Sequence, residues 1–181
     1  MNGNEINEII RTLLSLPKEC EWAEFKLNYH GEEELGKNIS ALSNGACLQG
    51  KPFGYILYGV DDTTISIKKG TTFHPKSQKV KQDELENWLL QRLSPRIDFE
   101  FIEGTYNELP IALVKIPAAQ GQPTSFLHND YVKVGSITRS LKDFPEKERK
   151  IWNSKVKNMP FEQQTAMVVD GPDEVVSLLS T

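Results

Sequence analysis

Apolar residues recur along the chain at two different spacings, which separate the expected helices from the expected strands. From Glu5 to Leu16 they return at helical spacing and Pro17 then stops the run, so this segment predicts an amphipathic helix. A second helix is expected from Leu35 to about Asn44-Gly45, and a third over residues 82–93. Asp143, followed three residues later by Glu146, predicts a capping box before a fourth helix, "EKERKIWNSKV".

Between these helices lie shorter stretches that read as strands. The segment "FGYILYGV", residues 53–60, is almost unbroken apolar and aromatic sequence, which favours a strand at the centre of a sheet. In "SFLHNDYVKV" the pair Asn129-Asp130 separates two short strand patterns and predicts a hairpin turn. Further strands are expected at residues 23–27, in "TISIKK", around Phe99 and Phe101, and over residues 111–116.

The order of these elements defines the expected fold class. Strands and helices interleave and at least one hairpin is present, so we expect an α/β or α+β fold with a mixed sheet flanked by helices. A chain of 181 residues is long enough for one domain, which we place at residues 1–157. Residues 158–181 show a weaker pattern and are interpreted as a linker or as the start of a following region.

Composition and charge narrow the setting. Apolar residues make up 38% and charged residues 25%, values typical of soluble globular proteins. The sequence has no signal-peptide pattern or apolar membrane span, and Cys20 and Cys47 form no CxxC motif, so we expect a cytoplasmic protein without membrane contact. The net charge of −4 gives no overall attraction to nucleic acid, which only a local basic patch could supply.

A cluster of acids near the N-terminus is the first candidate site. Glu19 and Glu21 precede the strand expected at residues 23–27, Glu24 and Lys26 lie within it, and Asp61-Asp62 end the presumed central strand. Carboxylates that converge from different elements can hold Mg²⁺ or Mn²⁺, and such an ion can activate water and offset phosphate charge. Convergence of Glu19 and Glu24 requires a turn between them, because they differ in parity along a straight strand. The alternative is an acidic strand end and an Asp-Asp turn that simply face water.

Basic residues gather in two later segments. The stretch "KKGTTFHPKSQKVK" contains no acid and carries phosphate-directed charge together with Phe73 and His74, an aromatic face for base stacking, unless it is only a solubilising loop. In "YVKVGSITRS" two basic residues flank a Gly-Ser turn that could bind an anion or be an ordinary hairpin turn. The candidate phosphate contacts are Lys68, Lys69, Lys76, Lys79, Lys81, Lys133 and Arg139. No P-loop, zinc motif or nucleophile elbow accompanies them.

Three blocks together resemble a known family. "ECEWAEFKLN", "ISALSNGACLQGKPFGYILYGVDD" and "YVKVGS" are similar to the AlbA-type DNA-binding domain of Schlafen proteins and of many bacterial regulators. The resemblance covers roughly Leu14 to Trp152. It implies that the chain is an N-terminal module followed by a further domain. Such proteins are described as DNA-binding proteins, transcriptional regulators or ATP-binding proteins.

The same resemblance also implies an enzymatic alternative. Animal Schlafens use these motifs in a metal-dependent endoribonuclease that cuts structured RNA such as tRNA. By motif, Glu19 and Glu24 match the two glutamates of E-x4-E and Asp62 matches the second aspartate after Gly-Val, with Lys26 helping to hold the phosphate. Because the animal nucleases clamp RNA between two such lobes, one lobe would need a second copy, so a homodimer is considered. Our leading hypothesis is a regulatory module that binds DNA or structured RNA, and the rival is the nuclease with Mg²⁺ or Mn²⁺. A third possibility is a protein-interaction domain whose sheet edge mediates assembly.

Overall fold

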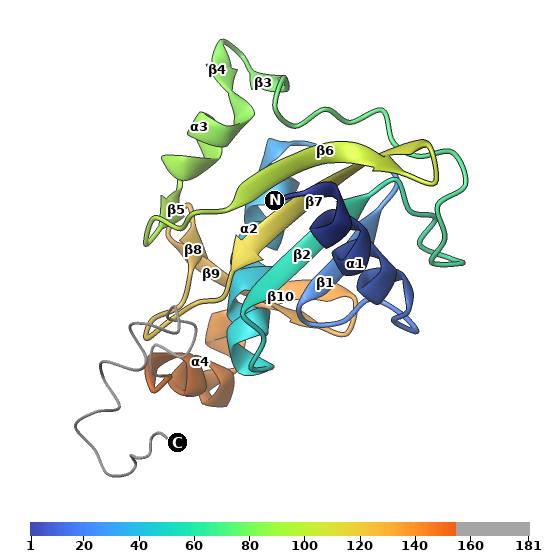
Figure 1. The fold of residues 1–181 in the computed structure, drawn as a ribbon. Helices are drawn as coiled ribbons and strands as arrows, with labels where there is room; N and C mark the ends of the chain where they lie inside the picture. Colours follow the sequence, from blue (N-terminus) through green and yellow to red (C-terminus); the bar gives the residue numbers. More distant parts are fainter. Residues whose placement is uncertain (155–181) are drawn as a thin grey trace, which may run out of the picture.

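A mixed four-stranded sheet lies at the centre of residues 1–154, the part of the chain that this computed structural model describes (Figure 1). Its strand order is β1-β2-β7-β6, where β1 is Ala23–Lys26, β2 Phe53–Tyr58, β7 Leu109–Pro117 and β6 Glu100–Tyr106. The pair β1 and β2 is parallel, whereas β7 runs antiparallel to both β2 and β6. The expected mixed sheet is confirmed, and β2 lies inside it.

Two helices cover the two faces of this sheet (Figure 1). Helix α1 (Gly3–Leu14) buries Ile10 and Leu13 on the face that carries Phe25 of β1. Helix α2 (Glu32–Leu48) buries Leu35, Ile39 and Leu42 against the opposite face, together with Ile56 and Val114. Side chains alternate between the faces of a strand, so β1 sends Ala23 and Phe25 toward α1 and leaves Glu24 and Lys26 on the α2 side.

A second small sheet packs on the other side of α2. Its order is β10-β9-β8-β5, from β5 (Leu93–Ser94), β8 (Ser125–Phe126), β9 (Asn129–Val134) and β10 (Ile137–Ser140). Ser40 Oγ donates to Thr124 O at 2.7 Å and Asn44 Nδ2 donates to Tyr131 O at 2.8 Å. Because buried polar groups need such partners, these bonds explain how polar residues of α2 are accommodated between two sheets.

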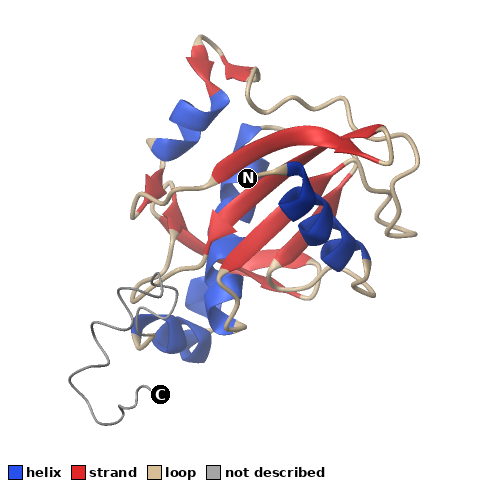
Figure 2. Cartoon of the chain, in the orientation of Figure 1, coloured by secondary structure: helices blue, strands red, loops and turns tan. Residues whose placement is uncertain are grey.

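The remaining elements lie at the periphery, as the colouring by secondary structure shows (Figure 2). They are β3 (Lys79–Val80), β4 (Asp83–Glu84), α3 (Leu85–Leu90), the 3₁₀ turn η1 (Leu141–Asp143) and α4 (Pro145–Trp152). Within residues 1–154 none of the helices has the length and apolar character needed to cross a bilayer. The proposed boundary after residue 157 and the fragment at residues 175–179 lie outside the described residues.

Helix α2 continues past Asn44-Gly45, where the sequence predicted its end. A Cβ atom at Gly45 would lie 1.9 Å from the carbonyl oxygen of Glu21, so the glycine serves as the contact point for the turn before β1. Glycine is therefore required here by close packing and does not end the helix. Helix α1 begins at Gly3, capped by Asn2 Oδ1, which accepts from the Glu5 N–H.

Two predictions around residues 64–93 are wrong. The helix expected over residues 82–93 is limited to α3, because Asp83-Glu84 pair with β3 and Leu93-Ser94 pair with β8. The strand expected in "TISIKK" does not form; a single bridge joins Asp61 to Ser66. The Asp61 carboxylate accepts from the Thr63 N–H at 2.9 Å, and this local hydrogen bond competes with a strand ladder.

Two turn signals near the end of the domain also need correction. The β8–β9 turn is formed by Leu127-His128, both at positive φ, while Asn129-Asp130 already belong to the ladder. Burial of Phe126 beneath α2, against Gly36, accounts for this register. The capping box between Asp143 and Glu146 does not form, because α4 starts with Pro145 and Asp143 lies in η1.

Candidate nucleic-acid interface

The candidate interface begins at β1, on the face that α2 covers. Glu24 is directly opposite Ile56 of β2 and is 4% exposed, so its carboxylate is buried beside the first turns of α2. Lys26 follows two residues later on the same face and is partly exposed. A buried carboxylate of this kind is costly unless it is paired and hydrogen-bonded.

Glu24 is paired with two lysines that come from different sheets. Lys133 Nζ of β9 lies 2.5 Å from Glu24 Oε1, and Lys26 Nζ lies 3.3 Å from Glu24 Oε2. Lys26 Nζ is also 3.7 Å from Glu34 Oε1 of α2. Apart from the contact with Lys133, Glu24 Oε1 has no hydrogen-bond partner among the described residues. Lys133 is itself buried, so this ion pair joins the second sheet to β1.

Glu19 reaches the same place through a tight turn. A bridge between Cys20 and Ala23 reverses the chain, and the Phe25 N–H then donates to Glu19 Oε2 at 3.0 Å. The turn that convergence of Glu19 and Glu24 requires is thus present. Burial raises the pKa of Glu19, and the neighbouring Glu24 carboxylate raises it further, while the Phe25 hydrogen bond and Lys133 act in the opposite direction.

Asp61 and Asp62 lie at the end of β2, on the other side of Lys26. Asp61 Oδ2 is 3.2 Å from Lys68 Nζ. The pKa of Asp61 is lowered, first by the Thr63 N–H and then by Lys68, so Asp61 remains ionised. Asp62 is exposed. Among residues 1–154, no three or more acidic, histidine or cysteine side chains are arranged to hold a metal ion.

Two adjoining clefts open over these groups and share Lys26 as a common wall. One, of about 480 Å³, lies between the start of α2 and the β9–β10 hairpin, and its lining includes Glu24, Lys133, Lys37 and Thr138. The other, of about 420 Å³, lies at the end of β1 and β2 and is lined by Lys26, Leu27, His30, Asp61, Asp62, Lys68 and Lys69. We call the pair the lysine clefts.

The predicted basic residues fall into separate groups. Lys68 and Lys69 line the second lysine cleft, and Lys133 lies buried in the first. The segment that carries Lys76, Lys79 and Lys81 leaves the clefts and follows the β6 edge toward β3 (Figure 1), and the Lys76 N–H donates to Glu103 of β6 at 2.8 Å. Arg139 is exposed on β10, one position after Thr138, and does not line either cleft.

The prediction that Phe73 offers an exposed aromatic face in the basic segment is wrong. This side chain is 4% exposed, stacked on Tyr29 at 4.5 Å between ring centroids and edge-on to Tyr58. Asn28 holds the segment down, because its Oδ1 accepts from Thr71 Oγ1 at 2.8 Å and from the Thr72 N–H at 2.9 Å. Phe73 is thus a core residue and cannot stack on a base.

Sequence reasoning overlooked several residues that line the first lysine cleft. Glu34, Lys37 and Asn38 stand at i, i+3 and i+4 on one side of the first turns of α2, and Asn38 Oδ1 accepts from Thr138 Oγ1 at 3.2 Å. Tyr131 completes the wall, with Lys37 Nζ 5.9 Å from its ring centroid. Their helical spacing was the available signal, since residues three and four apart share a helix face.

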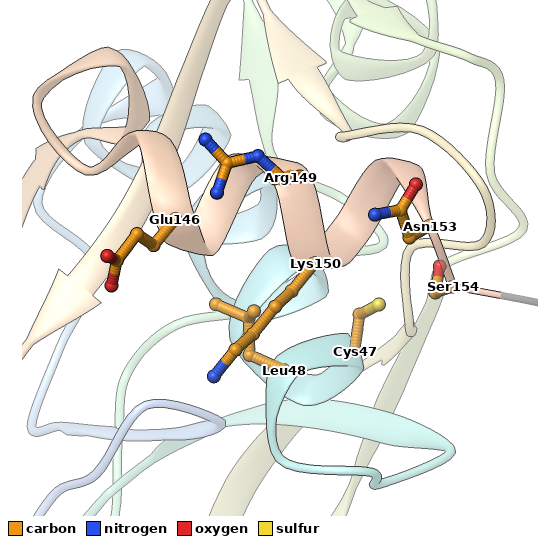
Figure 3. A pocket seen from close by; sticks show the side chains of 7 residues that line it. All are labelled: Cys47, Leu48, Glu146, Arg149, Lys150, Asn153 and Ser154. Atoms are coloured by element: carbon orange, nitrogen blue, oxygen red, sulfur yellow. The ribbon is translucent and has the colours of Figure 1, made fainter.

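A further pocket, of about 620 Å³, lies at the other end of α2, against α4 (Figure 3). It is lined by Cys47, Leu48, Glu146, Arg149, Lys150, Asn153 and Ser154. Leu48 stands 14 positions after Glu34, which corresponds to roughly 20 Å along a helix at about 1.5 Å per residue. This pocket is therefore separate from the lysine clefts.

The chain belongs to the family described as Schlafen, AlbA_2, which matches residues 19–142. The resemblance inferred from the three sequence blocks is thereby confirmed, and the match includes both acidic segments and the β9–β10 hairpin. No curated protein matches the chain significantly.

Two solved structures match the chain at low sequence identity. The DIP2311 protein from Corynebacterium diphtheriae is 15% identical over 76% of this chain, with a TM-score of 0.49, and this chain spans 26% of its length. The N-terminal domain of a RecG-related protein from Nitrosomonas europaea is 18% identical over 74% of this chain and 90% of its own, with a TM-score of 0.38.

Proposed function

We propose that this protein is a nucleic-acid-binding regulatory module in which the lysine clefts hold the phosphate backbone. Support comes from membership of the Schlafen, AlbA_2 family and from the concentration of lysines there in a chain with a net charge of −4. Nucleic acids are bound largely through their phosphates, which basic side chains neutralise.

The observation that carries the proposal is that each cleft presents a lysine with no carboxylate partner among residues 1–154. Lys133 and Lys26 pair with Glu24, and Lys68 pairs with Asp61, so these cations are partly neutralised. Lys37 in the first cleft and Lys69 in the second are exposed and form no salt bridge within the described residues. These two ammonium groups are free to meet phosphates without breaking an ion pair.

The clefts are suited to backbone contacts and offer few means of reading bases. Phe73 is buried, and among the residues described the clefts are lined by two side-chain rings, Tyr131 in the first and His30 in the second. Bidentate contacts to base edges, which give base preference, and stacking, which adds affinity without distinguishing bases, are both limited here. A nucleic acid long enough to reach beyond the clefts would also meet Lys76, Lys79, Lys81 and Arg139.

The test compares two variants of equal charge. Lys37→Gln/Lys69→Gln removes one free ammonium from each cleft, whereas Lys142→Gln/Lys150→Gln removes two exposed lysines from η1 and α4. Binding of a fluorescent duplex DNA and of a structured RNA is measured by anisotropy at low salt. The cleft variant should bind about tenfold more weakly and the control as wild type, given the phosphate contribution to affinity. Equal losses in both variants, or no binding by wild type, would refute the proposal.

A further inference from the structure

The endoribonuclease alternative implies a divalent cation at Glu19, Glu24 and Asp62, and the donor atoms here do not suit one. Mg²⁺ and Mn²⁺ need carboxylate oxygens at about 2 Å with free lone pairs. Both oxygens of Glu24 face ammonium groups, at 2.5 Å for Lys133 and 3.3 Å for Lys26. Glu19 Oε2 accepts from the Phe25 N–H at 3.0 Å.

The ammonium group of Lys133 is held in place by its surroundings. Lys133 is 3% exposed, and its Nζ lies 3.5 Å from the carbonyl oxygen of Ser136 in the β9–β10 turn as well as beside Glu24. The β9–β10 ladder pairs Lys133 with Thr138, which in turn donates to Asn38 of α2. Lys133 is thus fixed from both sheets and from α2 at the point where a cation would neutralise the carboxylates.

Asp62 does not complete a ligand set with the two glutamates. It lines the second lysine cleft, which Lys26 separates from Glu24. Its immediate neighbour Asp61 is occupied by Lys68 and by the Thr63 N–H. A divalent ion beside Glu24 would therefore lack the third carboxylate and would lie against a buried positive charge that repels it.

We infer that Lys133 stands in place of a divalent cation beside Glu24, so that the lysine clefts bind a phosphate backbone without Mg²⁺ or Mn²⁺. The inference that the clefts bind a phosphate backbone rests on the proposed function. The inference that Lys133 replaces a metal ion does not. The carboxylates then serve to hold Lys133 and Lys26 in position, and phosphates meet the outward-facing lysines.

The direct test is to titrate the full chain with Mn²⁺ and to measure the concentration of free Mn²⁺ by electron paramagnetic resonance. Wild type should show no stoichiometric site. Lys133→Met removes the ammonium group while filling most of its space, and should bind Mn²⁺ about tenfold or more tightly than wild type because the repulsion is gone. Glu24→Gln/Lys133→Met should lose that gain in affinity, whereas Glu108→Gln/Lys133→Met, which changes an exposed acid between β6 and β7, should keep it.

One stoichiometric Mn²⁺ per wild-type chain that disappears in Glu24→Gln would overturn the inference, and this comparison holds even where Lys133→Met fails to fold. Cleavage of tRNA by wild type with Mn²⁺, lost in Glu24→Gln, would overturn it as well. Nucleic-acid affinity should be equal in EDTA and in Mn²⁺. Absence of binding in both would refute the proposed function, while the Mn²⁺ titration would still decide the role of Lys133.

Discussion

At the scale of single residues, the interface depends on Glu24 and Lys133, which are both almost completely buried. Removing charges from water is costly, and each group is tolerated because the other is 2.5 Å away. Lys26 offers Glu24 a second, more exposed partner. Loss of one member should therefore cost more than loss of both.

Lys133→Met should lower the free energy of unfolding by about 3 kcal/mol, because it leaves the buried Glu24 carboxylate with only its outer partner. Glu24→Met/Lys133→Met should regain most of this loss. Urea denaturation of the three proteins measures both effects. Lys68→Met, which breaks a more exposed pair with Asp61, is the control. A Lys133→Met cost no larger than that of Lys68→Met would contradict the assignment of a buried ion pair.

Glu19 should make stability depend on pH. Burial, followed by the repulsion of Glu24, raises the pKa of Glu19 above its ordinary value of 4.5, so its stabilising contribution is present below that pH and is lost as pH rises through the folded-state value. Glu19→Gln keeps an acceptor for the Phe25 N–H and should be more stable than wild type at pH 7, but not at pH 4. Thermal unfolding at both pH values tests this, with Glu108→Gln at an exposed position as the control. A Glu19→Gln variant less stable than wild type at pH 7 would contradict the raised pKa of Glu19.

At the scale of elements, α2 positions most of the interface. Its first turns supply Lys37 and Asn38, and near its other end Gly45 contacts the turn that carries Glu21 and brings Glu19 back to β1. That close approach depends on the absence of a side chain at Gly45. The packing of α2 is thus linked to the geometry of the acids.

Gly45→Ala should destabilise the domain by about 1–3 kcal/mol, the usual cost of overpacking, since the new Cβ would meet the Glu21 carbonyl. Gly3→Ala is a suitable control because a Cβ there has open space and alanine favours helices. Chemical denaturation gives the two free energies. Equal stability of Gly45→Ala and wild type would contradict this, because it would mean that the turn at Glu21 can move to make room for the Cβ atom.

The elements that the sequence predicted well are those whose own residues decide their structure. The apolar run at residues 53–58 forms β2, and the helical spacing before Pro17 forms α1. In both segments the local pattern alone defines the element, whichever element packs against it. Leu93-Ser94 became a strand because Ser125 and Phe126 lie alongside, which no local pattern encodes. In the same way, Gly45 resembled a helix end until its contact with Glu21 was known.

The candidate interface was predictable only in part for a related reason. The position of Glu19 and Glu24 near each other followed from motif resemblance and a required turn. The burial of Lys133 could not be predicted, because it depends on β9 crossing the start of α2 more than 100 positions after Glu24. A basic segment likewise does not reveal that Phe73 turns inward onto Tyr29.

At the scale of the whole molecule, the lysine clefts differ in charge from the rest of the chain. The protein carries a net charge of −4, whereas the clefts are lined by five lysines and four carboxylates, which are Lys26, Lys37, Lys68, Lys69 and Lys133 with Glu24, Glu34, Asp61 and Asp62. The negative net charge repels a polyanion, whereas the lysines of the clefts attract it. Association should therefore occur at this face and be sensitive to ionic strength.

The most direct measurement is the dependence of duplex affinity on salt concentration for wild type and for Lys37→Gln/Lys69→Gln. For wild type the logarithm of affinity should fall linearly with the logarithm of salt concentration, and the double variant should reduce this slope by about 2, close to one unit per lost phosphate contact. The Lys142→Gln/Lys150→Gln control should keep the wild-type slope. An unchanged slope in the cleft variant would contradict the claim that the lysine clefts hold the backbone.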